Sequence, residues 1–115
     1  MSTINHTKQP SGNTRTLIAQ WANMASGDVG DAIGFSQYTD KSVQVFGTFG
    51  ANGALSLEGS NNGTDWAVLT DPQGNNLNIT SPKIEMVIEA TLYVRPVVTS
   101  GDGTTDLTVI LLMKE

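Results

Sequence analysis

Cysteine is absent from this 115-residue chain, and histidine occurs once, as His6. Without cysteine there is no disulfide framework, no thiolate zinc site and no cysteine nucleophile. His6 lies in a polar N-terminal stretch, which offers no scaffold for a histidine-based catalytic dyad. The sequence contains no recognisable nucleophile, general base or oxyanion assembly. We therefore expect that the protein is not an enzyme and has no small-molecule substrate.

Long hydrophobic runs are absent too. None approaches the ~20 apolar residues of a membrane-spanning helix, and the N-terminus lacks the apolar core of a signal peptide. Basic residues are few, since six Lys and Arg stand against eleven Asp and Glu, for a net charge of −5. General nucleic-acid binding needs basic surface to displace counterions from phosphate. We accordingly expect neither a membrane nor a nucleic-acid partner.

Gly, Thr, Ser and Asn are abundant and together make up 44 of the 115 residues. Ser, Thr and Asn favour caps and turns, and glycine costs ~1 kcal/mol per helical position relative to alanine. Apolar and polar residues instead alternate with a period of two, which is typical of strands. The strands predicted from this alternation are Thr16–Met24, Val29–Phe35, Ser42–Phe49, Ala54–Ser60, Asp65–Leu69, Leu77–Thr80, Lys83–Ala90, Leu92–Thr99 and Asp106–Met113.

About eight or nine short strands with this spacing predict an all-β fold, an antiparallel β-sandwich of jelly-roll-like type. Turn residues separate the strands, including the Asn-Gly pair at 52–53 that is typical of a hairpin. In Lys83–Ala90 we expect Ile84, Met86 and Ile88 to face the core. Pro96 predicts an edge position or a bulge for its strand, because proline cannot donate to a sheet ladder.

The charge is distributed unevenly along the chain. Residues 1–16 contain Lys8, Arg15 and no acidic residue, whereas the remaining residues contain four basic and eleven acidic residues. The first segment also lacks apolar periodicity. We therefore expect a flexible, extended N-terminal arm over residues 1–16 and a single β-sandwich domain over residues 17–115. The arm is either a frayed terminus or a basic segment that orders on an acidic partner.

Carboxylates occur in three suggestive pairs. Glu85 and Glu89 would lie ~13 Å apart on one face of a strand, too far for a glycosidase pair. Two further pairs offer oxygen ligands of the kind that hard cations prefer, but neither pair has the spacing of a calcium loop. These pairs are Asp28 with Asp31 and Asp102 with Asp106. We predict that all three are structural or solvated, and we expect no metal site and no cofactor.

Two longer segments of the sequence carry a resemblance to a known class of proteins. They are LEGSNNGTDWAVLTDPQG at 57–74 and YVRPVVTSGDGTT at 93–105. They resemble the "GSNDGTxW" turn and the "YVRPxVTxGDGTT" strand-turn of small structural proteins of tailed bacteriophages. Asn62 replaces the commoner Asp, and Val97 replaces a frequent second Arg. The resemblance covers residues 43–113.

This resemblance implies a head decoration (cement) protein, which binds the outer surface of the assembled phage head and stabilises it. Such proteins are compact β-sandwiches or jelly rolls, often homotrimers, and their partner is the major capsid protein. The chain would then belong to the virion after synthesis in the bacterial host cytoplasm, whose reducing conditions suit a chain without cysteine. The basic residues Lys8, Arg15 and Arg95 are the candidate capsid contacts. Arg95 equally suits a local stacking or ion-pair role beside Tyr93.

Two other functions are compatible with the sequence. One is a carbohydrate-binding β-sandwich module of a phage tail or fibre, because discoidin-type and other sugar-binding sandwiches contain a similar "GSNDGTNW" turn. Trp66 and Tyr93, with Tyr38, would then stack on the sugar rings. Trp66 would otherwise plug one end of the sandwich core. The other function is a structural component of the phage tail or neck.

Overall fold

The computed structural model describes residues 2–12, 15–34 and 37–115. These residues form eleven strands and no helix. The strands are β1 (Thr3–Ile4), β2 (Thr7–Gln9), β3 (Thr16–Met24), β4 (Val29–Gly30), β5 (Asp40–Thr48), β6 (Ala54–Ser60), β7 (Ala67–Val68), β8 (Asn78–Ile79), β9 (Lys83–Val87), β10 (Tyr93–Ser100) and β11 (Asp106–Lys114). Each of the nine predicted strands overlaps an observed strand, and β3 and β6 have the predicted bounds. Strands β4 and β7 are only two residues long, and Phe35, at the end of the predicted Val29–Phe35, lies outside the described residues. The all-β prediction is confirmed.

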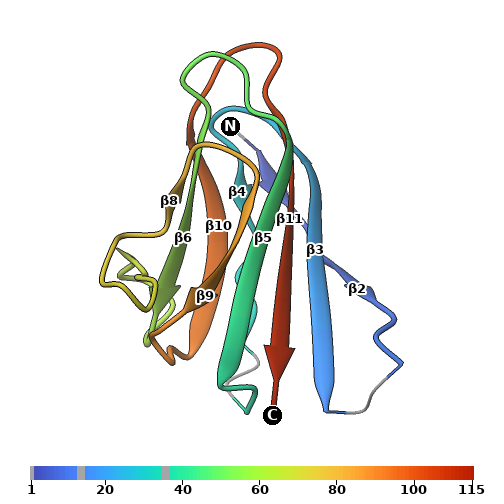
Figure 1. Cartoon of the computed structure of the whole chain (residues 1–115), viewed down its shortest axis with the longest axis vertical. Coiled ribbons are helices and arrows are strands. Elements are labelled where there is room, and N and C mark those ends of the chain that lie inside the picture. The colour runs from blue at the N-terminus through green and yellow to red at the C-terminus, as the bar shows by residue number, and fades with distance from the viewer. Residues whose placement is uncertain (1, 13–14, 35–36) are drawn as a thin grey trace.

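The strands form two stacked sheets. One has the order β2-β3-β11-β5-β9, and the other has the order β1-β4-β10-β6-β7 with β8 also paired to β6. Figure 1 shows the first sheet in front of the second. Without the short strands β1, β2 and β7, the orders are β3-β11-β5-β9 and β4-β10-β6-β8. Eight strands divided between two antiparallel sheets in these orders form a jelly roll.

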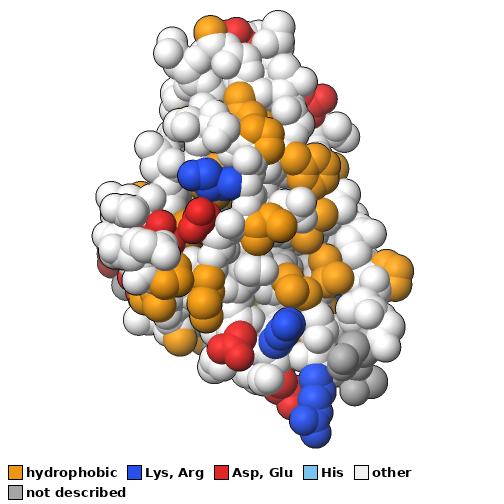
Figure 2. All heavy atoms as spheres, in the orientation of Figure 1, with side chains coloured by type: hydrophobic (Ala, Val, Ile, Leu, Met, Phe, Trp, Pro, Cys, Tyr) orange, Lys and Arg blue, Asp and Glu red, His pale blue; other side chains and the backbone are white. Residues whose placement is uncertain are grey.

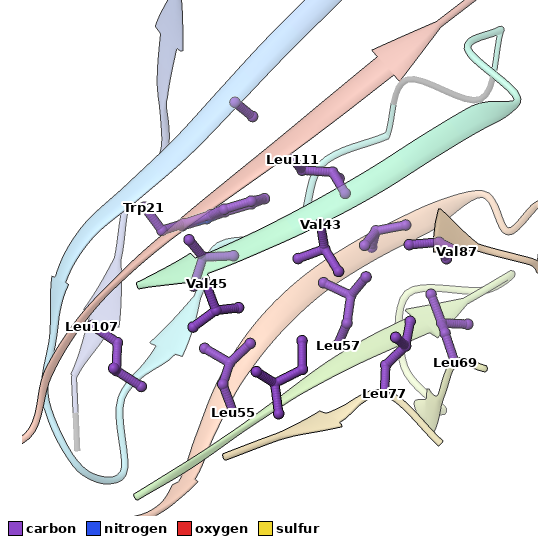
Figure 3. Close-up of a cluster of buried hydrophobic side chains, with 14 of the residues drawn as sticks. Trp21, Val43, Val45, Leu55, Leu57, Leu69, Leu77, Val87, Leu107 and Leu111 are labelled. Carbon is purple, nitrogen blue, oxygen red and sulfur yellow. The ribbon is translucent and has the colours of Figure 1, made fainter. Parts of the chain in front are cut away.

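The core lies between the two sheets. Trp21 on β3, Leu111 on β11 and Leu57 on β6 are all fully buried in one cluster, and Leu69 and Leu77 lie at the end of it away from Trp21 (Figure 3). Each fully buried Leu or Val contributes roughly 1.5–3 kcal/mol relative to an exposed one. The alternating residues of the long strands therefore supply most of the free energy that holds the sheets together.

Strand β9 faces the opposite way from the prediction. Ile84 is 61% exposed, Met86 47% and Ile88 54%, whereas Val87 is buried. The register explains the difference, because Ile84 lies opposite Gln44 on the outer face of β5. Directly paired residues of neighbouring strands share a face. An edge strand with a single buried side chain thus places its apolar stripe on the surface.

Pro96 does not mark an edge strand, because β10 lies in the interior of its sheet between β4 and β6. Val94 and Val98 donate their amides to the Ile33 and Asp28 carbonyls on the β4 side. The nitrogen of Pro96, which lies between them and carries no hydrogen, faces the same side, and Gly30 packs against the proline ring there. A Cβ at Gly30 would lie 2.6 Å from the proline ring, so the close approach requires glycine there. The bulge falls later, between Val98 and Ser100.

The N-terminal segment is part of both sheets and does not extend away from the domain as expected. Strand β1 pairs in parallel with β4, and β2 pairs antiparallel with β3 through the register Lys8–Ala19. These two strands are short and lack apolar alternation, so nothing in their own sequence predicts them. For residues 2–9, the expectation of an arm outside the core is wrong.

Two carboxylates hold this segment in place. Asp28 accepts hydrogen bonds from the Ser2 and Ala25 amides at 3.0 and 2.9 Å. Asp31 accepts bonds from the His6 amide at 2.8 Å and from the Trp21 indole Nε1 at 2.8 Å, and it contacts His6 Nδ1 at 2.9 Å. Asp31 therefore links the N-terminal strands to the largest side chain of the core.

Replacing Asp31 with Ala should destabilise the fold by about 2–3 kcal/mol, because hydrogen bonds to charged groups each contribute ~1.5–3 kcal/mol and the buried indole loses its best acceptor. Urea denaturation followed by circular dichroism measures this change. Asp106→Ala, at an exposed carboxylate on β11, is the matched control and should change stability by less than ~0.5 kcal/mol. Equal stability of the two variants would contradict the anchoring role of Asp31.

A third carboxylate, Asp102, ties two loops together at one end of the sandwich. It accepts hydrogen bonds from Thr104 Oγ1 at 2.6 Å, from the Ala51 amide at 2.8 Å and from the Thr104 amide at 2.8 Å. These bonds, led by the one from the Thr104 hydroxyl, lower the pKa of Asp102 to about 2. The close approach requires Gly50, whose φ is +72° and whose Cβ would lie 2.3 Å from the Asp102 carboxylate.

The depressed pKa of Asp102 predicts a pH-dependent contribution to stability. Because ionisation is easier in the folded state, the contribution is complete above the unfolded pKa of 3.8 and is lost as pH falls toward about 2. Asp102→Asn should therefore lower the melting temperature at pH 7, and the difference from the native chain should shrink between pH 4 and pH 2. A difference that stayed constant over this range, measured by thermal circular dichroism, would refute the linkage.

Candidate interaction surfaces

The outer face of the five-stranded sheet is built from residues that the strand register places in rows. One row runs across the strands as Gln9, Ile18, Leu112, Ser42 and Met86. The next row runs as Thr7, Gln20, Ile110, Gln44 and Ile84. A third, shorter row consists of Thr108 and Phe46. We call these twelve residues the β11 face, because β11 lies at its centre.

The β11 face contains no charged residue. Its apolar side chains include Ile84 and Met86, about half exposed, and Phe46, 39% exposed. A hollow of about 470 Å³ lies over the first two rows. In Figure 2 the hydrophobic side chains gather across the middle of this surface, with charged side chains toward its margins. At one end, Lys114 and Asp40 lie opposite each other in the register.

Sequence reasoning missed this surface, although a signal was present. The central strand β11 carries Leu107, Val109 and Leu111 on its buried face and Ile110 and Leu112 on the other. A half-buried antiparallel strand normally alternates apolar with polar residues. Apolar residues on both faces of β11 therefore indicate that one face packs in the core and that the other is suited to contact with another protein surface.

The outer face of the other sheet carries a charged cluster. Arg95 on β10 lies opposite Glu58 on β6, and its Nε and Nη2 atoms are each 3.0 Å from Glu58 Oε1. The guanidinium also lies over the Trp66 ring, 4.1 Å from its centroid. Trp66 is half-buried and does not plug the core. One face of its ring is thus covered by Arg95 and is not available to a sugar.

The other predicted site residues are dispersed. Tyr93 lies two residues before Arg95, and the Gly63 turn packs against its ring. Tyr38 packs against the core. Lys8 and Arg15 are exposed at the β2–β3 hairpin on the edge of the five-stranded sheet. The structure therefore brings Arg95, Trp66 and Tyr93 to one side of the molecule and leaves Lys8 and Arg15 on another sheet.

The three suggestive carboxylate pairs do not form a common site. Glu85 lies on β9, whereas Glu89 lies beyond its end and accepts a hydrogen bond from the Thr70 amide at 2.8 Å. Asp28, Asp31 and Asp102 make the structural contacts described above, and Asp106 is exposed. Within residues 2–12, 15–34 and 37–115 no three His, Asp or Glu side chains are grouped to hold a metal ion. The same residues include no helix long and apolar enough to cross a membrane.

Comparisons with known proteins identify similar folds. No family model and no curated protein sequence matches the chain. The crystal structure of the SPBc2 prophage-derived protein YomS is similar with a TM-score of 0.66 and 13% identity, over 90% of this chain and 97% of that one. The Schizosaccharomyces pombe Cnp3 cupin domain gives a TM-score of 0.49 at 4% identity, over 95% of this chain and 59% of that one. An RmlC-like cupin protein from Desulfovibrio desulfuricans gives 0.48 at 9%, over 96% and 82%.

Removing the Arg95 side chain should expose Trp66 without unfolding the protein. Arg95→Ala should increase acrylamide quenching of Trp66, while Trp21, fully buried in the core, stays protected. Because the cluster is partly exposed, the loss of stability should be no more than about 1 kcal/mol. Lys83→Ala on β9 is the control and should leave quenching unchanged. Unaltered quenching in Arg95→Ala would refute the stacking of Arg95 on Trp66.

Proposed function

We propose that the chain is a structural protein of a tailed-bacteriophage virion, specifically a decoration protein that binds the outer surface of the assembled head. The observation that carries this proposal is its similarity to YomS, a prophage-derived protein, over 90% of this chain and 97% of that one. Two jelly rolls of the same extent, one of them from a prophage, agree with the phage resemblance of the segments 57–74 and 93–105. The fold and the sequence motifs thus support the same class by separate routes.

The physical task of such a protein suits this chain. A protein that binds the assembled shell better than the free capsid subunits stabilises the shell through linkage alone. This function requires no catalytic group and no cofactor. The proposed partner is the major capsid protein, and many copies of a modest contact together reinforce the shell against the pressure of packaged DNA. In this proposal the protein is made in the bacterial host cytoplasm and then joins the virion.

The proposed capsid contact is the β2–β3 hairpin with Lys8 and Arg15. These exposed basic residues stand out on a chain that is otherwise acidic, so they suit an acidic protein surface. Strand β2 is paired with β3, so Lys8 lies on a paired edge strand of the sheet. A preformed edge loses less conformational entropy on binding than a disordered arm. Arg95, the third candidate contact, lies on the other sheet and binds Glu58 and Trp66.

Electron microscopy of virions with and without the chain tests the proposal directly. The expected result is density for this protein on the outer surface of the head that disappears when its gene is deleted. Density at the neck or along the tail would overturn the decoration role in favour of a neck or tail component. Saturable binding on a glycan array that Trp66→Ala abolishes would instead favour a carbohydrate-binding module.

Reversing the charge of the hairpin should weaken capsid binding. Lys8→Glu/Arg15→Glu should lower the affinity for heads lacking the protein by about tenfold or more, because each change replaces an attraction with a repulsion. The measurement is co-sedimentation with such heads over a range of salt concentrations. Lys83→Glu/Lys114→Glu, at two exposed basic positions on β9 and β11, makes the same change of net charge; it is the matched control and should bind like the native chain. Equal loss in both proteins would mean that net charge, not the hairpin, governs binding.

A further inference from the structure

The β11 face has the composition of an interface core and not that of a solvated surface. The chain contains seventeen charged residues, yet none of them belongs to the twelve residues of this face. The solvent face of an antiparallel sheet is normally polar, with charges interspersed. Depletion of charge at the centre of a surface is instead the compositional mark of a protein–protein interface. The exposed Ile84 and Met86 reinforce this interpretation.

The charge distribution favours a second copy of the chain as the occupant. Two copies, each with a net charge of −5, repel each other in most orientations. The twelve residues of the β11 face are uncharged, so two copies that meet through this face bring no like charges together there. Gln20 and Gln44 lie in the same row, and each amide both donates and accepts hydrogen bonds. Such amides can donate hydrogen bonds to, and accept them from, the same residues of a second copy across a two-fold axis, because the two copies then contact each other through identical patches. At the margin, Lys114 and Asp40 form a locally neutral end.

The size of the β11 face fits a weak dimer. Five strands spaced ~4.8 Å apart make the first two rows about 24 Å wide and 14 Å deep, and the third row adds only the β11 and β5 positions. Two copies in contact would bury roughly 800 Å² in total, which is the size of a weak interface. The face belongs to a sheet, and two sheets stack at ~10 Å with their strands aligned. The two outer faces can therefore interdigitate as the inner faces do.

We propose that a second copy of the chain docks on the β11 face, sheet against sheet about a two-fold axis. The contact is isologous. It includes outward-facing residues of β2 and β3, but Lys8, Arg15 and the Arg95 cluster are not among its twelve residues. It differs from the homotrimer that the phage resemblance implies, because a self-complementary patch closes at two copies. The proposal concerns the chain alone, so it stands or falls independently of capsid binding.

Sedimentation equilibrium of the purified full chain, without capsid, tests the dimer. The native chain should show a concentration-dependent shift from the 12.2 kDa monomer to twice that mass. Ile84→Lys should raise the dissociation constant by about tenfold or more, because it places an ammonium group in the apolar contact. Val68→Lys, at a 37% exposed apolar residue on the other sheet, is the matched control and should leave the dissociation constant unchanged.

A second variant keeps the test independent of folding. Gln44→Glu is nearly isosteric and places like charges from the two copies in one contact. It should weaken the dimer at 50 mM salt and regain part of the affinity at 500 mM, because salt screens the repulsion. A native chain that stays monomeric at millimolar concentration would overturn the proposal. So would a stable trimer, or a dimer whose dissociation constant is the same in the native chain and in both β11-face variants.

Discussion

The register of β11 between β3 and β5 is the constraint on which the rest of the structure depends. Successive residues of a strand point to opposite faces, so a slip of one residue exchanges the two faces completely. In the observed register Val109 lies between Trp21 and Val45, and all three are buried. The same pairing aligns Ile110 with Gln20 and Gln44 outside. One set of backbone hydrogen bonds thus determines both the core and the uncharged outer surface.

The sequence predicted the strands because their signals are local. Alternation within nine residues identifies β3 and β11, and the Asn-Gly pair identifies the β5–β6 hairpin, in which Asn52 has a φ of 58°. Which face of β9 points to the core depends on non-local information. The alternating pattern of Ile84, Met86 and Ile88 is the same whether these side chains point to the core or to solvent. Strands β1 and β2 were missed for a related reason. Asp28 and Asp31 hold them from more than twenty residues away, and no pattern within 2–9 reports that contact.

The candidate surfaces show the same division between local and non-local information. Sequence reasoning selected Arg95, Trp66 and Tyr93 as separate residues, and it offered local stacking or ion pairing as one role for Arg95. Only the register of β10 with β6 identifies Glu58 as the ionic partner, and only the folded turn brings Trp66 beneath the guanidinium. The β11 face needs three strand pairings at once. No single strand predicts it, although the apolar residues on both faces of β11 indicate it.

The proposed capsid contact and the proposed dimer contact use different residues of one sheet, and this separation has a consequence for binding. Lys8 and Arg15 lie on the edge hairpin, whereas the centre of the β11 face lies across β11 and β5. A dimer formed through that face carries two such hairpins. When one hairpin binds a capsid subunit, the second binds at an effective concentration set by the rigid dimer, provided that the lattice spacing matches. Pairing would therefore raise the occupancy of a shell without any new capsid contact.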